Sequence, residues 1–218
     1  MKYTLIIVCL IFAVNLNAQK LKNISQKVDD GYTEKYTVLK SDKSVRHGEF
    51  ALYDSNKNLF MKGYYQQNEK DSVWTSYTWN GEVIQKYNYT TNKLEYFNSG
   101  DEADSQYVHI DSVRINAKVD SPPAFISGER AMALVIQRNV VYPPSAVENG
   151  EVGMVYVYFE ITVDGKAVNH KVVKGASEVL DKEAIRVIKK IPDEWVPSYI
   201  DGKPVHTEFV MPVNFRLG

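Results

Sequence analysis

The sequence predicts two regions of different fold class: an all-β N-terminal repeat ribbon and an α+β C-terminal unit, in which two helices cover a three-stranded antiparallel sheet. Three observations predict this. A 24-residue repeat of aromatic and apolar strands begins at His47. A long alternating run, Gly153–Val163, has the period of two that is typical of a half-buried strand. The order hairpin, helix, strand that follows fits helices packed on one sheet.

The chain begins with a segment that we interpret as a secretory signal. Lys2 precedes an apolar run, Leu5–Val14, which is shorter than the ~20 residues that a membrane-spanning helix needs. We expect cleavage after Ala18, so that residues 1–18 are the signal peptide and the mature protein is exported. If the segment is retained instead, the expected location is the inner membrane.

Composition argues against several classes of function. The 218-residue chain has a formal net charge of −1, which gives no electrostatic reason to expect nucleic acid as a partner. Its one cysteine, Cys9, lies in the apolar segment, so the mature chain has no thiol chemistry. No histidine pair shows metal-ligand spacing, and no glycine-rich phosphate loop follows a strand. We therefore expect no enzyme activity, no catalytic residue, no metal and no cofactor. The histidines are His47, His109, His170 and His206.

Residues 28–97 contain the internal repeat. The stretch His47–Phe50 aligns with Asp71–Trp74, and each unit contains an aromatic strand, a polar turn, an apolar strand and a second polar turn. The patterns Gly48-Glu-Phe-x-x-Tyr and Val73-Trp-x-x-Tyr resemble degenerate MORN repeats, whose hairpins follow one another in a ribbon. The second unit departs from that family, because it has Asp71-Ser72 where glycine is usual. We expect the aromatic side chains to form the core of the ribbon.

The segment 98–121 is predicted to link the two regions. Asn98–Ser105 is acidic and polar, which favours a turn or linker. Tyr107–Val119 alternates in part and predicts one further strand or hairpin. At Asp120-Ser-Pro-Pro-Ala the prolines fix an extended break, where we place the domain boundary.

The C-terminal unit, residues 122–218, contains the remaining predicted elements. Apolar residues at helical spacing predict two helices, and Asp164-Gly165 predicts the turn of a hairpin. The predicted elements are a helix from Ser127 or Gly128 to Asn139, one helical turn at Ser145–Asn149, strands at Gly153–Val163 and Ala167–Lys174, a helix at Ser177–Ile191, and a last strand at Val205–Arg216.

A series of short motifs occurs in order along this unit. They are Pro122-Pro123-Ala124-Phe125, Tyr142-Pro143, Gly150-x-x-Gly153, Val163-x-Asp-Gly165, Leu180-Asp-Lys-Glu-Ala-Ile185, Trp195-x-Pro197, Gly202-Lys-Pro-Val205 and Pro212-Val-x-Phe215. Each is weak alone, but their order and spacing together resemble the C-terminal domain of TonB, in the form common in Bacteroidetes-like bacteria.

The resemblance implies a periplasmic protein that binds the TonB-box peptide of an outer-membrane transporter, in support of energy-coupled transport. In this family the peptide adds as a strand to an open sheet edge. By position that edge is the last strand, and a proline in it fits an edge location. An open edge also allows a homodimer by the same pairing. The predicted edge residues are Val205, His206, Thr207, Glu208, Phe209, Val210, Met211, Pro212 and Val213.

The Tyr142-Pro143 pair has two interpretations. The resemblance implies a receptor contact there, although Val141 precedes the pair where the best-known members have glutamine. The pair also fits a simple stop to the preceding helix, because the residue before proline avoids the helical conformation.

A second functional hypothesis places the activity in the ribbon. In it, the protein is an envelope scaffold whose repeats bind a partner protein, a glycan or a lipid surface. The repeats stand where a complete energy transducer has a Pro/Lys/Glu-rich spacer, so we do not expect this chain to couple proton-motive force alone.

Overall fold

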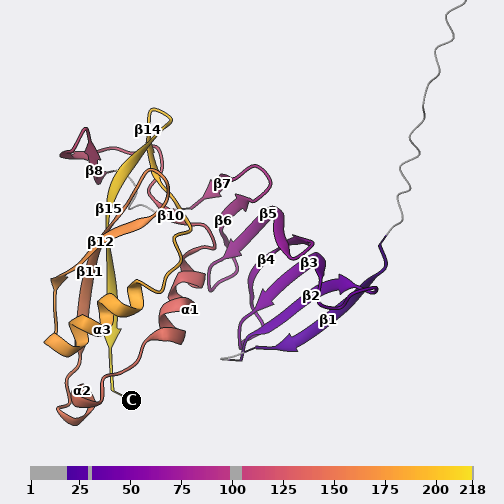
Figure 1. Cartoon of the computed structure of the whole chain (residues 1–218), viewed down its shortest axis with the longest axis horizontal. Helices are drawn as coiled ribbons and strands as arrows, with labels where there is room; N and C mark the ends of the chain where they lie inside the picture. The colour runs from indigo at the N-terminus through magenta and orange to yellow at the C-terminus, as the bar shows by residue number, and fades with distance from the viewer. Residues whose placement is uncertain (1–18, 29–30, 99–104, 218) are drawn as a thin grey trace, which may run out of the picture.

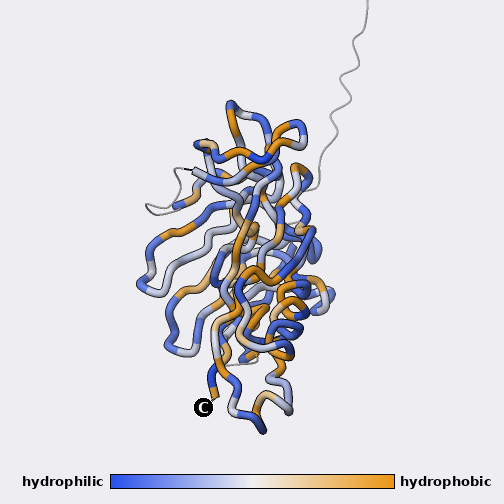
Figure 2. Tube along the Cα trace, turned by 90° about the vertical axis from the view of Figure 1, so that its left-hand side faces the viewer, coloured by the Kyte–Doolittle hydropathy of each residue, from blue (hydrophilic) through white to orange (hydrophobic). Residues whose placement is uncertain are grey.

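The computed structural model describes residues 19–28, 31–98 and 105–217 (Figure 1). Two antiparallel sheets dominate it: a seven-stranded sheet in the N-terminal half and a six-stranded sheet in the C-terminal half. Helix α1 (Glu129–Asn139) lies between them in Figure 1. Figure 2 shows hydrophobic stretches both in the centre of the molecule and along some outer strands and loops, with hydrophilic stretches between them.

Strands that follow one another along the chain are neighbours in the N-terminal sheet, which runs in the order β1-β2-β3-β4-β5-β6-β7. This succession of antiparallel hairpins agrees with the predicted ribbon, although the first strand begins before residue 28. The strands are β1 (Leu21–Lys27), β2 (Thr33–Leu39), β3 (Arg46–Tyr53), β4 (Leu59–Gln66), β5 (Glu69–Tyr77), β6 (Val83–Asn88) and β7 (Lys93–Phe97).

The 24-residue repeat is present in the backbone itself. Left-handed φ values recur at this interval in three pairs of residues, and β-bulges recur where β3 meets β4 and where β5 meets β6. Ser72 therefore keeps the left-handed conformation of the glycine one repeat earlier, at φ 57°. The pairs are Gly48 with Ser72, Lys57 with Gly81, and Asn68 with Asn92.

Aromatic rings fill the face of this sheet that is turned toward α1, which we call the inner face. The ring of Trp74 stacks on Phe50 at a centroid distance of 5.2 Å. Gly63 makes room for it, because a Cβ atom on Gly63 would lie 2.2 Å from Trp74 Cδ2. Leu134 of α1 packs on the same aromatic cluster, so the expected aromatic core of the ribbon also includes a residue of the C-terminal half.

The C-terminal sheet has the order β12-β11-β15-β8-β9, with β14 paired to the start of β15. Two further helices, α2 and α3, belong to this half. The elements are β8 (Gln106–Ile110), β9 (Val113–Ala117), β10 (Ala124–Phe125), α2 (Pro144–Glu148), β11 (Gly153–Ile161), β12 (Ala167–Lys174), α3 (Glu178–Ile188), β13 (Trp195–Val196), β14 (Ser198–Ile200) and β15 (Lys203–Phe215). Counting α1, the helices number three among the described residues: α1, α2 and α3.

The predicted C-terminal fold is therefore correct only at its centre. The three expected strands are adjacent as β12, β11 and β15, but the β8–β9 hairpin extends the sheet. The hairpin docks because Val108 is completely buried with Val119 and Val205. Periodicity alone cannot show such docking, since a short alternating run does not reveal which strand it will pair with.

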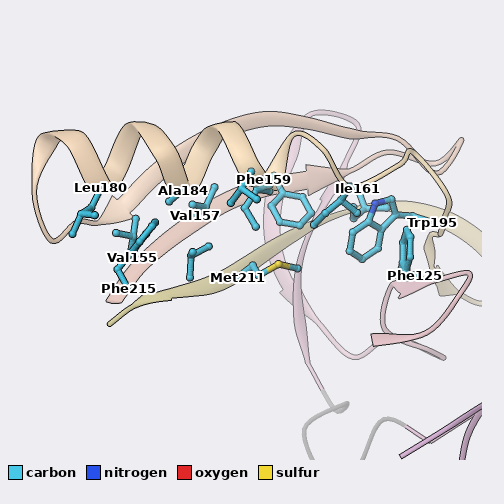
Figure 3. Close-up of a cluster of buried hydrophobic side chains, with 14 of the residues drawn as sticks. Phe125, Val155, Val157, Phe159, Ile161, Leu180, Ala184, Trp195, Met211 and Phe215 are labelled. Atoms are coloured by element: carbon cyan, nitrogen blue, oxygen red, sulfur yellow. The ribbon is translucent and has the colours of Figure 1, made fainter. Parts of the chain in front are cut away.

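Helix α3 and the sheet enclose the main hydrophobic core (Figure 3). The helix begins after Ser177, whose hydroxyl accepts a hydrogen bond from the Leu180 N–H, and it ends at Ile188, earlier than predicted. Its apolar stripe packs on the odd-numbered residues of β11 and β15. Figure 3 labels Leu180 and Ala184 on the helix and Val155, Val157, Phe159, Ile161, Met211 and Phe215 on the strands.

Polar contacts join the two halves beside α1. Arg130 Nη2 donates to Asp54 Oδ2 at 3.1 Å, and both side chains are buried. The buried Gln85 amide donates to the carbonyls of Phe125 and Ile126 at 3.0 and 2.6 Å. These contacts pair the Arg130 Nη groups and the Gln85 amide nitrogen, although Arg130 Nε and Gln85 Oε1 are buried without a hydrogen-bond partner among the described residues. They hold the two halves together.

Candidate functional site: the open edge of β15

Strand β15 alternates cleanly between the two faces of its sheet. Its odd-numbered side chains from Val205 to Phe215 face the helical side, where all but the half-buried Phe209 are buried. Its even-numbered side chains face away from the helices, and Val210 is 48% exposed. This is the period of two that a sheet with one solvated face requires.

The direction of the backbone groups follows from the turn between β11 and β12. The Thr162 N–H donates to the Lys166 carbonyl at 2.9 Å, so even-numbered residues of β11 point their backbone groups toward β12. Odd-numbered residues of β11 then point toward β15. The β11–β15 register runs without a shift from Ile161↔Thr207 to Gly153↔Phe215. Odd-numbered residues of β15 therefore bond to β11, and even-numbered residues present their backbone groups at the opposite edge.

Pro212 agrees with this assignment. Its nitrogen has no hydrogen to donate, and prolines within sheets occur where the missing donor would face away from a ladder. As an even-numbered residue, Pro212 directs that nitrogen to the edge opposite β11. The full register of β15 with β11 is kept on both sides of it.

The start of this edge is already covered. His206 and Thr207 pair with His109 and Val108 of β8 on this side, whereas Val205, an odd-numbered residue, pairs with Ser198 of β14 on the side of β11. Among the residues that the structure describes, no strand pairs with β15 beyond Thr207 on this side. Of the predicted edge residues Val205–Val213, His206 and Thr207 already pair with β8, so the part of this edge without a described neighbour begins at Glu208.

A charged cluster marks the end of the open edge next to β8. Arg114 Nε donates to Glu208 Oε1 at 2.6 Å, and its Nη2 donates to Glu208 Oε2 at 3.0 Å. His109 Nε2 lies 3.0 Å from the same carboxylate. The hydrogen bonds from Arg114, and then from His109, hold the pKa of Glu208 below its usual value. An ionised Glu208 therefore fastens the hairpin beside the open positions.

The solvated face next to the open edge is amphipathic. Val210 lies opposite Tyr158, and Pro212 lies opposite Tyr156 on β11. Lys171 Nζ lies 4.3 Å from the ring centroid of Tyr158. A strand added beside β15 would thus place alternate side chains next to an apolar pair, Val210 and Pro212.

Tyr142 and Pro143 lie near the far end of β15. The Tyr142 ring meets that of Phe215 edge-on, with centroids 5.8 Å apart, and its hydroxyl donates to the Glu151 carbonyl. Pro143 is the N-cap of α2, which starts with Pro144. The pair therefore separates α1 from α2, and it also places Tyr142 against Phe215, the last residue of β15.

Sequence reasoning missed Arg114 and His109, which define one end of the site. The signal that could have found them is the partial alternation in the segment from Tyr107 to Val119, but it gives no pairing partner. Within the described ranges, no group of three His, Cys, Asp or Glu side chains could hold a metal ion.

Comparison with known proteins bears on the C-terminal half. A model of the family described as Gram-negative bacterial TonB protein C-terminal matches residues 138–217, which include α2, α3 and β11 to β15 but only the last two residues of α1. A comparison with curated proteins found no match. The NMR solution structure of the Helicobacter pylori TonB-CTD is 26% identical, with 40% of this chain and 79% of that chain covered and a TM-score of 0.29. Residues 138–217 are thus similar to the C-terminal domain of Gram-negative TonB proteins.

Proposed function

We propose that the protein binds an extended peptide of a partner as an added strand along Glu208–Asn214. The observation that carries the proposal is the row of even-numbered backbone groups at an edge where no described strand pairs. In this stretch Val210 and Asn214 each offer an N–H, and all four even-numbered residues offer a carbonyl. Main-chain bonds of this kind supply affinity, and alternate side chains supply selectivity.

The proposed partner is the TonB-box peptide of an outer-membrane transporter. The match of residues 138–217 to the TonB C-terminal family supports this choice, and binding at the edge would serve energy-coupled transport. We further propose that the family type is that of Bacteroidetes-like bacteria, with MORN-like repeats in the N-terminal sheet. Tyr142 and Pro143, near the far end of the edge, are proposed as a receptor contact.

The proposed location is the periplasm, reached by export and cleavage after Ala18. Across the ranges that the structure describes, no helix has the length and apolar character needed to cross a membrane. Outer-membrane transporters present their periplasmic segments in that compartment, so the location and the proposed partner agree.

The direct test is to remove one main-chain donor from the open edge. Val210→Pro deletes an N–H that faces the guest strand, whereas Val210→Ala deletes only the side chain. We expect Val210→Pro to weaken binding of a synthetic TonB-box peptide by about tenfold, because a net hydrogen bond contributes ~0.5–1.5 kcal/mol and the guest strand loses its register there. Val210→Ala should weaken it much less. Titration calorimetry with both variants measures the difference.

Two outcomes would count against the proposal. Equal losses for both variants would mean that the side chain, and not strand addition, carries binding. If the wild-type protein recovers no transporter from outer-membrane extracts, the TonB-box peptide is not its partner. A homodimer through the same edge is a competing occupant, and analytical ultracentrifugation over a range of protein concentrations detects it as a dimer that Val210→Pro disrupts.

A further inference from the structure

A single row of side chains crosses the whole N-terminal sheet. Each member lies opposite the next on the neighbouring strand, so the row runs perpendicular to the strands. Three of its members are lysines on alternate strands, β2, β4 and β6, and we call these the lysine row. In order from β1 to β7 the members are Ser25, Lys35, Ala51, Lys62, Thr75, Lys86 and Tyr96.

The lysine row lies on the face of the sheet turned away from α1. Successive side chains of a strand point to opposite faces. The neighbours Met61, Trp74 and Gln85 are buried on the inner face, and Gln85 reaches the Phe125 carbonyl there. The row between them therefore points outward, and all three lysines are exposed.

The spacing of the three ammonium groups is regular. Alternate strands of a sheet lie two strand spacings apart, or roughly 9.5 Å. No ion pair with a carboxylate forms at Lys35, Lys62 or Lys86 among the residues that the structure describes. Their charges are separated by about one Debye length at physiological salt. The three lysines therefore form a line of positive charge that no described carboxylate neutralises and that attracts anions.

Tyrosines and polar groups lie beside the row. Lys35 Nζ is 4.7 Å from the ring centroid of Tyr53, and Lys62 Nζ is 6.0 Å from that of Tyr77, so two of the three ammonium groups have an aromatic face next to them. At the β1–β3 end the same face is hollowed by about 360 Å³, next to the small side chain of Ala51. Other side chains at the hollow are Asn23, Ser25, Thr37 and Glu49.

We propose that the lysine row binds a linear anionic polysaccharide that lies across the strands, with an acidic group on every second sugar ring. Two sugar rings span about the distance between successive lysines. A single line of charge fits a linear polymer better than a flat anionic membrane. Glu49, as an anion within the hollow, accepts hydrogen bonds from hydroxyl groups but repels a continuous run of phosphates. Tyrosine rings alongside suit the apolar faces of sugars.

This proposal is independent of strand addition at β15 and needs its own test. The probe is hyaluronan, a linear polymer with one carboxylate on every second sugar, and the readout is binding by affinity electrophoresis at low and high salt. The triple variant Lys35→Gln, Lys62→Gln, Lys86→Gln removes the row. The triple variant Lys40→Gln, Lys43→Gln, Lys57→Gln removes the same charge from exposed loop lysines of the same sheet and is the matched control.

We expect the row variant to bind hyaluronan about tenfold more weakly, because three exposed ion pairs with modest individual effects are lost. The control variant should bind within about twofold of the wild type on the same reasoning, and high salt should weaken wild-type binding. Circular dichroism establishes that both variants are folded. Val210→Pro should leave this binding unchanged, which separates the result from that for the peptide.

Three results would overturn the proposal. Equal losses in the two triple variants would mean diffuse charge attraction with no site. Wild-type protein that binds vesicles of phosphatidylglycerol but not hyaluronan would assign the row to a lipid surface. If neutral dextran and hyaluronan bind equally well, the acidic groups of the polysaccharide do not contribute to binding.

Discussion

The guanidinium of Arg130 on α1 donates to the carboxylate of Asp54, which follows β3, across the junction between the two halves. The same guanidinium also donates to the carbonyls of Tyr77 and Thr78. Burying two charges is costly unless each is paired and hydrogen-bonded. Here both conditions hold, so α1 is fastened to the N-terminal sheet while its apolar residues also pack on the C-terminal core.

Removing the carboxylate of this pair should destabilise the junction strongly. Asp54→Asn leaves a buried guanidinium without its counter-ion, and breaking such a pair costs about 3–5 kcal/mol. We expect a clear fall in the urea midpoint. Asp42→Asn is the control, because Asp42 is exposed and its carboxylate accepts hydrogen bonds from Ser44 within its own turn. If the urea midpoint falls equally in both variants, the Asp54–Arg130 pair contributes no more to stability than an exposed carboxylate.

The same aspartate should make the junction sensitive to acid. Burial by itself raises the pKa of Asp54, but hydrogen bonds from Asn58, Asn56 and Arg130 lower it below its ordinary value of 3.8. A carboxyl with a depressed folded pKa contributes stability above its unfolded pKa and loses that contribution as the pH falls through the folded value. The melting temperature of the wild type should therefore drop more steeply below about pH 4 than that of Asp54→Asn. Parallel curves for the two proteins would contradict this.

Much of the C-terminal fold could be predicted because its strands carry their own signal. In Gly153–Val163 and in the last strand, period-two alternation coincides with burial on one face. The docking of β8 onto His206 and Thr207 could not be predicted, because it depends on a register between segments that lie about a hundred residues apart. The lysine row shows the same limit. Lys62 and Lys86 are related by the sequence repeat, but only strand register brings Lys35 into line with them.

The β8–β9 hairpin should be part of the C-terminal folding unit. Val108 is completely buried against Val119 and Val205, so a fragment that starts at residue 122 exposes this small core. A fragment of residues 105–218 should melt higher than one of residues 122–218, by about 4–8 °C for each kcal/mol of lost stability. Val108→Ala within the longer fragment is the companion variant and should remove most of the gain. If the two fragments melt at the same temperature, the β8–β9 hairpin does not stabilise the C-terminal unit.

The assignment of backbone directions in β15 can be tested by stability alone. Met211 is an odd-numbered residue whose N–H faces Val157 of β11, whereas the N–H of Val210 faces the open edge. Met211→Pro should cost at least about 2 kcal/mol, because it removes a ladder hydrogen bond and a buried side chain. Val210→Pro should cost less than about 1 kcal/mol, since proline is tolerated at a sheet edge whose donor faces solvent. Thermal unfolding of the two variants measures both costs. If Val210→Pro proves the more damaging, the even-numbered residues bond to β11, and the open edge would present the odd-numbered backbone groups instead.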